Sequence, residues 1–314
     1  MNKPISYSAP AKVILSGEHA VVYGKPALIT AIDMRLAVTI TPAQKTAHID
    51  PQMAKIVNTV VQFLKQQKKE YIQKPFSYGI TSSIPAGRGL GSSAALSAAF
   101  SGALLEHFTG HEWSREEVNN CAYQVEKIFH GNPSGADVST SVFGGLIYFR
   151  KEFEFLKTIS SLTLKIPQVI GDNLFVIDTG KPLETTGEMV AGVGKKYNKN
   201  PLKVEKLLNE IEKTTKRLVV ALAKEDSSLF QDTIRANHQL LCDIGVVSKQ
   251  TKKIIDDLEQ IGVGKVTGGG GKKEGSGFIL FYAAHHKQLH EYGKKNKLDI
   301  IKLQPTTIGL RKEN

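Results

Sequence analysis

The sequence predicts an α+β protein built from two halves, and three observations support this prediction. Strand-like runs with β-branched residues and helical segments with apolar residues every three or four positions occur in both halves. The length of 314 residues suits about two domains. The chain has no internal repeat and no low-complexity linker. We therefore expect an N-terminal domain at residues 1–160 and a C-terminal domain at residues 161–314.

The first half is expected to begin with strands and continue with helices. Apolar spacing predicts a helix at residues 51–69, and a glycine-rich run leads into an alanine-rich helix at residues 94–105. Ser114 and Glu117 form a capping box that opens the next helix, which is expected to end by Gly131. The predicted strands of this half are residues 5–8, 13–15, 36–40, 76–80 and 145–150.

The second half is expected to contain long amphipathic helices and a second glycine cluster. This cluster, residues 267–271, stands directly before a strand at residues 277–282. A last helix and strand are expected within residues 285–310. The other predicted strands are residues 161–166 and 173–178, and the predicted helices are residues 202–222, 228–244 and 248–261.

Composition narrows the class of protein. The 41% hydrophobic content is ample for sizeable cores, and the sequence has neither a signal-like start nor an apolar run long enough to span a membrane. We therefore expect a soluble cytoplasmic protein. The net charge of +11 comes mostly from scattered lysines, which favours small anionic ligands over nucleic acid or a membrane surface. Cys121 and Cys242 are interpreted as buried thiols.

The junction at residues 87–93 is the most informative local feature. Its sequence, Gly-Arg-Gly-Leu-Gly-Ser-Ser, lets backbone N–H groups turn toward an anion at the start of a helix, where the helix dipole is positive. It fits neither the P-loop nor the dinucleotide-binding spacing. Taken alone, such a run is also typical of a tight connection.

Two carboxylates have both a catalytic and a structural interpretation. Glu126 stands at the border of an apolar helix face and suits a magnesium ligand, but a salt bridge with Lys127 or Lys3 is the ordinary alternative. Asp137 suits a base that accepts a proton from an alcohol. If Ser134 is the N-cap, however, Asp137 occupies the third helical position, where an acid is commonly a capping group.

Three further residues stand near the N-terminus. Lys12 enters an apolar strand, where a surface lysine on an edge strand is the ordinary explanation. Glu18 and His19 follow Gly17 and fit a substrate-recognition turn, although a histidine in a loop is more often structural. The histidines near residue 290 lie among lysines and lack zinc-site spacing.

Three segments, taken in order, resemble the signature motifs of the GHMP kinase superfamily. They are residues 10–24, residues 84–95 and residues 265–271. Within the superfamily, residues 12–24, residues 126–137 and Thr186 with the Met-Val-Ala-Gly-Val that follows it are most similar to the mevalonate kinases.

The resemblance implies a two-domain fold in which ATP and substrate bind between an N-terminal α+β domain and a ferredoxin-like C-terminal domain. It implies transfer of the ATP γ-phosphoryl group to the C5 hydroxyl of mevalonate, with Mg²⁺ as cofactor. The implied roles are base for Asp137, assisted by Lys12; magnesium ligands for Ser93 and Glu126; substrate binding for Glu18, His19 and Thr186; and phosphate binding for Gly87, Gly89, Leu90, Gly91, Ser92 and Ser93.

The sequence departs from the family pattern at two places. The third motif is followed by Lys-Lys-Glu-Gly-Ser at residues 272–276 instead of a short link, which puts its ATP contacts in question. Val138 stands where the family often has Asn. Phosphomevalonate or homoserine is an alternative acceptor, and a non-catalytic protein that binds its ligand as a sensor is an alternative function. For the assembly, a homodimer is an alternative to a monomer. A phosphomevalonate site needs extra cations, for which Lys181, Lys195 and Lys196 are candidates.

Overall fold

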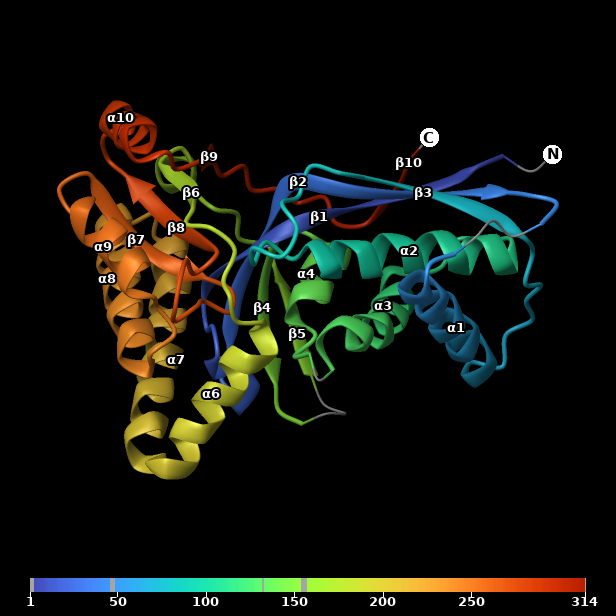
Figure 1. Cartoon of the computed structure of the whole chain (residues 1–314), viewed down its shortest axis with the longest axis horizontal. Helices are drawn as coiled ribbons and strands as arrows, with labels where there is room; N and C mark the ends of the chain where they lie inside the picture. Colours follow the sequence, from blue (N-terminus) through green and yellow to red (C-terminus); the bar gives the residue numbers. More distant parts are fainter. Residues whose placement is uncertain (1–2, 46–48, 132, 154–156, 314) are drawn as a thin grey trace.

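The computed structural model describes residues 3–45, 49–131, 133–153 and 157–313. Two antiparallel sheets carry the architecture, one in each half of the molecule (Figure 1). In the described residues no helix is long and apolar enough to cross a membrane. Both cysteines are free thiols; Cys121 is buried, as expected, whereas Cys242 is only partly buried.

The first sheet has the strand order β10-β1-β2-β4-β5, and β3 pairs with β2. The two predicted strands at residues 5–8 and 13–15 are parts of one strand, β1, whose register shifts between Pro10 and Ala11. Proline has no backbone N–H, so a bulge there lets the strand continue. The strands are β1 (Ile5–Ser16), β2 (Ala27–Pro42), β3 (Phe76–Ser82), β4 (Leu146–Lys151), β5 (Lys157–Leu162) and β10 (Arg311–Glu313).

Helices cover one face of this sheet (Figure 1). The central one, α2, contacts β1, β2 and α3, and its many alanines allow close packing on both sheet and helices. The predicted capping box of Ser114 and Glu117 opens α3, and Gly131 caps its C-terminus. The helices are α1 (Pro51–Gln66), α2 (Ser92–Thr109), α3 (Arg115–His130) and α4 (Ala136–Phe143), and a short η1 (Ala20–Tyr23) follows β1.

The second sheet has the order β7-β8-β6-β9. Helix α8 contacts β7, and α7 contacts α8 as well as β1 and β2 of the first sheet. The strands are β6 (Leu174–Asp178), β7 (Gly262–Thr267), β8 (Phe278–Ala283) and β9 (Ile300–Lys302). The helices are α5 (Gln168–Gly171), α6 (Thr186–Lys199), α7 (Pro201–Ala223), α8 (Ser227–Ile244), α9 (Lys249–Asp257) and α10 (His286–Asn296).

Several expected elements differ from the structure. The strand expected at residues 161–166 ends at Leu162, and the helix expected to reach residue 261 ends at Asp257. Helix α6 was not expected as an element. The final strand β10 returns to the first sheet and pairs with β1, so the C-terminal end of the chain completes that sheet. The division at residue 160 remains a prediction.

Candidate active site

The glycine-rich run forms a loop that ends at the N-terminus of α2. Gly87, Gly89 and Gly91 all have positive φ, at 71°, 95° and 80°, a conformation that glycine adopts without strain. Leu90 is buried and its carbonyl accepts a hydrogen bond of 3.0 Å from the Lys12 amide. Among the described residues, no side chain caps the start of α2. Its first amides therefore remain available to an anion, as the sequence predicts for a phosphate loop.

Lys12 and Asp137 form an ion pair beside this loop. Lys12 Nζ lies 3.0 Å from Asp137 Oδ2, and the lysine side chain is 2% exposed while the aspartate is 39% exposed. The surface-lysine interpretation of Lys12 is wrong, because its side chain is buried. Within the described part of the chain, β10 pairs with β1 only at Ser6–Ser8, and the Lys12 amide instead donates to the Leu90 carbonyl of the loop. A Cβ placed on Gly91 would lie 2.8 Å from Lys12 Cγ, so the glycine leaves space for the lysine stem.

The capping interpretation of Asp137 is also corrected. Gly135, in a left-handed conformation, is the N-cap of α4, and Asp137 is the second residue of the helix rather than the third. Ser134 Oγ only accepts a 3.2 Å hydrogen bond from the Ala136 amide. The Asp137 carboxylate pairs with Lys12. A half-exposed carboxylate next to a buried ammonium is suited to accept a proton or hydrogen bond from an alcohol.

Glu126 lies deeper than its expected position on the helix flank. It is 2% exposed, and its two carboxylate oxygens accept hydrogen bonds from Ser93 Oγ at 2.9 Å and Ser97 Oγ at 2.8 Å. His130 Nε2 lies 3.0 Å from Ser93 Oγ and 3.3 Å from Glu126 Oε1. Burial raises the pKa of Glu126, and the neighbouring His130 and the two serine hydroxyls oppose this shift. Its structural context is a hydroxyl-lined site rather than a lysine salt bridge at the surface.

Ser93 and Glu126 fit a magnesium ion that is shared with a nucleotide. Both donors are oxygen atoms, which Mg²⁺ prefers, and they lie at the N-terminus of α2 where the phosphate loop ends. The described residues contain no group of three or more carboxylate, histidine or cysteine side chains that would enclose a metal by themselves. Two protein ligands, completed by phosphate oxygens and water, are the usual arrangement for Mg²⁺ with a nucleotide.

Glu18 pairs with a residue that the sequence analysis did not single out. Lys265 Nζ donates to Glu18 Oε1, and both side chains are fully buried, at 0% and 1% exposed. Burial raises the pKa of Glu18 and lowers the pKa of Lys265, while the mutual attraction opposes both shifts. The one feature of the sequence that indicates Lys265 is its position as a charged residue within the apolar strand β7. Lys12 in β1 has the same feature.

His19 and Thr186 both lie against Gly269 of the second glycine cluster. His19 Nε2 donates to the Gly269 carbonyl over 3.0 Å, and a Cβ on Gly269 would lie 3.1 Å from Thr186 Oγ1. Burial lowers the pKa of His19 to about 4, so the ring is neutral at pH 7. Because a carbonyl only accepts, the proton lies on Nε2 and Nδ1 carries a lone pair. Nδ1 is buried and has no hydrogen-bond partner among the described residues.

The second glycine cluster packs directly on the phosphate loop. A Cβ on Gly268 would lie 3.3 Å from the Gly89 carbonyl oxygen, and one on Gly277 would lie 2.6 Å from the Arg88 carbonyl oxygen. Thr267 Oγ1 accepts a 2.9 Å hydrogen bond from the Ile14 amide in β1. The three segments found in the sequence therefore meet at one place between the two sheets.

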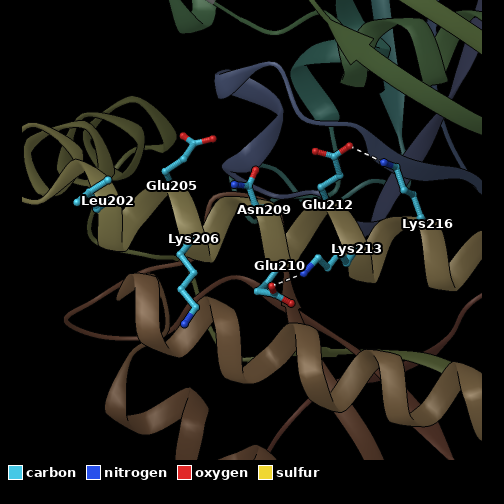
Figure 2. Close-up of a pocket in the computed structure, with 8 residues that line it drawn as sticks. All are labelled: Leu202, Glu205, Lys206, Asn209, Glu210, Glu212, Lys213 and Lys216. Atoms are coloured by element: carbon cyan, nitrogen blue, oxygen red, sulfur yellow. Dashed lines mark hydrogen bonds and ion pairs between the residues drawn. The ribbon is translucent and has the colours of Figure 1, made fainter.

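Two of the hollows formed by the described residues lie outside this meeting point. One, of about 470 Å³, borders the start of the phosphate loop, where Arg88 and Asp178 form an ion pair. The other, of about 580 Å³, runs along the exposed face of α7 (Figure 2). Figure 2 shows that charged side chains line it and that two of its ion pairs, Glu210–Lys213 and Glu212–Lys216, lie within the helix itself. The residues that line this hollow include none of the candidate site residues described above.

The three candidate cations from the sequence analysis differ in position. The Lys181 side chain lies against the phosphate loop, since a Cβ on Gly87 would be 3.3 Å from Lys181 Cε. Lys196 Nζ instead donates to the Ile244 carbonyl at the end of α8. Lys195 lies on the exposed surface of α6.

Comparisons with known proteins agree with the meeting of the three sequence segments at one place. Residues 55–145 match the family described as GHMP kinases N terminal domain. The mevalonate kinase of Thermococcus sibiricus is 33% identical over 315 residues, which cover 90% of this chain and 89% of the relative. The chain belongs to the mevalonate kinase family. The mevalonate kinase of Pyrococcus horikoshii is also 33% identical, over 86% of this chain and 87% of the relative.

The fold of the mevalonate kinase family extends over the whole chain. A crystal structure of L. major mevalonate kinase in complex with R-mevalonate superposes with a TM-score of 0.75, covers 98% of this chain and 99% of that chain, and is 24% identical. The predicted two-domain GHMP kinase fold is thereby confirmed. Asn132, part of the sequence segment that resembles the family, lies outside the described residues.

Proposed function

We propose that this chain is a magnesium-dependent mevalonate kinase. It transfers the γ-phosphoryl group of ATP to the C5 hydroxyl of mevalonate and releases 5-phosphomevalonate and ADP. The proposal rests on the Lys12–Asp137 pair beside a glycine-rich anion loop, in a chain whose relatives carry this name. Transfer of a phosphoryl group from ATP to an alcohol needs a loop that binds the phosphates, oxygen ligands for a metal ion, a cation and a group that positions the acceptor.

The phosphate loop is proposed to hold the ATP phosphates. Its three glycines have positive φ, which allows a turn whose amides face an anion, and the start of α2 adds further donors and a positive dipole end. Ser93 and Glu126 are proposed to hold Mg²⁺, which when bound neutralises charge on the phosphates. Lys181 lies against Gly87 and brings a positive charge to the same loop.

Asp137 is proposed to act on the acceptor alcohol. The C5 oxygen forms the new bond to the γ-phosphorus, the bond from that phosphorus to the β,γ-bridging oxygen breaks, and the alcohol proton passes to Asp137. The Lys12 ammonium, 3.0 Å from the carboxylate, is held by the packing of its stem against Gly91. From there it compensates charge on Asp137 and on the transferred group.

His19 and Thr186 are proposed to orient the acceptor. The lone pair on His19 Nδ1 accepts a hydrogen bond from an acceptor hydroxyl, which fits an alcohol and disfavours direct contact with a carboxylate. Glu18 acts through its neighbours, since its ion pair with Lys265 anchors the turn that presents His19. His19 itself has a positive φ of 59°, a conformation unusual outside glycine and typical of functional turns.

A panel of acceptors tests the proposed function. Purified protein with ATP and Mg²⁺ is expected to release ADP with mevalonate and to give a product phosphorylated at C5. Phosphomevalonate, homoserine and galactose serve as the alternative acceptors. Turnover of phosphomevalonate or homoserine without turnover of mevalonate would assign the chain to another acceptor, and binding without turnover of any acceptor would favour the sensor interpretation.

A further inference from the structure

The segment at residues 272–276, which departs from the family pattern, is firmly anchored at both ends. The Gly271 amide donates to the Val246 carbonyl over 3.0 Å, and the Ser276 amide donates to Thr179 Oγ1 over 2.9 Å. A Cβ on Gly271 would lie 2.6 Å from the Gly275 carbonyl oxygen, so the two ends of the segment nearly touch. The three residues between them, 272–274, project as a short loop whose base is fixed.

Lys272 extends from this loop toward α6. A Cβ on Gly192 would lie 2.8 Å from Lys272 Nζ, so the ammonium rests directly on α6 at Gly192. The backbone amide of Lys272 donates to Glu184 Oε2 over 3.3 Å, which fixes where the side chain begins. In the part of the chain that the structure describes, the Lys272 ammonium has no ion-pair partner.

The position of Lys272 relates to the acceptor side of the site. Gly192 lies on the same helix as Thr186, and Lys272 directly follows the glycine cluster that contacts His19 and Thr186. The positive charge of Lys272 is close enough to contribute to the lowered pKa of His19. An unpaired cation therefore lies near the two groups that are proposed to contact the acceptor.

We infer that Lys272 determines specificity by binding the carboxylate of the acceptor. The inference rests on the proposed function, because it assigns a partner to the charged end of the same substrate. His19 Nδ1 offers a lone pair and suits a hydroxyl, so a separate cation is needed for the carboxylate. A lysine ammonium supplies a charge-assisted hydrogen bond. The lysine-containing loop thus adds a recognition group and does not merely lengthen a connection.

Steady-state kinetics of Lys272→Gln at saturating ATP tests this inference. The KM for mevalonate is expected to rise about tenfold or more, as loss of a charge-assisted hydrogen bond typically produces, while kcat and the KM for ATP stay within about twofold. Lys272→Arg keeps the charge and is expected to retain most of the affinity. Lys273→Gln is the matched control, since Lys273 is the adjacent exposed lysine and its charge acts on Glu188 at the start of α6.

A neutral acceptor makes the test specific to charge. In 3-methylpentane-1,3,5-triol a hydroxymethyl group replaces the carboxylate of mevalonate, so Lys272→Gln is expected to leave the KM for this triol unchanged. This is a substrate–enzyme double-mutant cycle. An equal rise in KM for both acceptors, or no rise for mevalonate, would overturn the inference.

Failure of the Lys272 assignment can be distinguished from failure of the proposed function. If the wild-type protein does not phosphorylate mevalonate, the proposed function fails, and the same Lys272→Gln comparison is made with homoserine, which also carries a carboxylate. If wild-type turnover of mevalonate is normal and Lys272→Gln has the wild-type KM, only the assignment of Lys272 fails. A melting curve of each variant shows that the protein is folded.

Discussion

At the scale of single residues, the site combines buried charges with one half-exposed carboxylate. Glu126 is buried with two serine hydroxyls on its oxygens, and burial raises its pKa. A carboxylate in this setting is costly unless a positive charge compensates it. We therefore expect bound Mg²⁺ to stabilise the ionised form of Glu126.

Glu126→Gln is expected to raise the magnesium concentration needed for half-maximal rate and to lower turnover by about two orders of magnitude, because an amide keeps the shape but loses the charge at the metal. The measurement is a magnesium titration of the initial rate. Glu116→Gln on the exposed first turn of the same helix is the control and should match the wild type. Wild-type magnesium dependence in Glu126→Gln would mean that the carboxylate has only a structural role.

The sequence indicated which residues gather at the candidate site better than it indicated their partners. Lys12, Ser93, Glu126 and Asp137 were named from motifs, because glycines and charged residues in apolar segments stand out along a chain. The partner of Glu18 was missed, since Lys265 is 247 residues away and only the packing of β7 against β1, which belong to different sheets, brings the two together. Long-range contacts of this kind are set by tertiary packing and leave no local pattern.

At the scale of elements, the two glycine clusters form one structure. Gly268 has a φ of 89°, and its Cα faces the carbonyl of Gly89 so closely that a Cβ would lie 3.3 Å away. The phosphate loop is thus supported from the second half of the chain. Its shape depends on the absence of side chains at this contact.

Gly268→Ala is expected to raise the KM for ATP by about three- to tenfold. The substitution strains a left-handed residue by roughly 1–2 kcal/mol and presses on the phosphate loop. Gly110→Ala is the matched control, because Gly110 also has a positive φ of 82° but caps the far end of α2 with open space around it. If both variants lose stability equally and neither changes the KM for ATP, the two clusters do not act together on the nucleotide.

Prediction of elements failed where local patterns were weak. Helix α6 includes Gly187, Gly192 and Gly194, which lower helix propensity, and only two of its side chains are buried hydrophobics. Its existence depends on the capping box of Thr185 and Glu188 and on packing against α7. The long helices α7 and α8, with regular apolar faces, were predicted within one residue at each end.

At the scale of the whole molecule, buried polar contacts join the two sheets. Lys265 in β7 reaches both Glu18 and the Ile14 carbonyl, and Thr267 bonds the same strand β1. Helix α7 contacts β1 and β2 as well as α8. These contacts connect the two halves of the molecule. They therefore fix the site residues of one half relative to those of the other.

Lys265→Met is expected to lower the free energy of unfolding by about 3–5 kcal/mol, because it leaves Glu18 buried without its partner. The double variant Lys265→Met with Glu18→Gln should recover part of this loss, since it removes both charges. Urea unfolding of the three variants measures the effect. If Lys265→Met lowers the free energy of unfolding by less than about 1 kcal/mol, the Glu18–Lys265 ion pair does not stabilise the packing of the two sheets.

The central claim is that Asp137, paired with Lys12, acts on the alcohol of mevalonate. The most direct test is the rate of mevalonate-dependent ADP release by Asp137→Asn, with its melting curve recorded alongside. The variant keeps the side-chain shape but leaves the buried Lys12 ammonium without its charged partner, so it should lose about 1–3 kcal/mol of stability. Turnover should fall by about 10²-fold or more because no proton acceptor remains. A folded Asp137→Asn variant with near wild-type turnover would contradict the account.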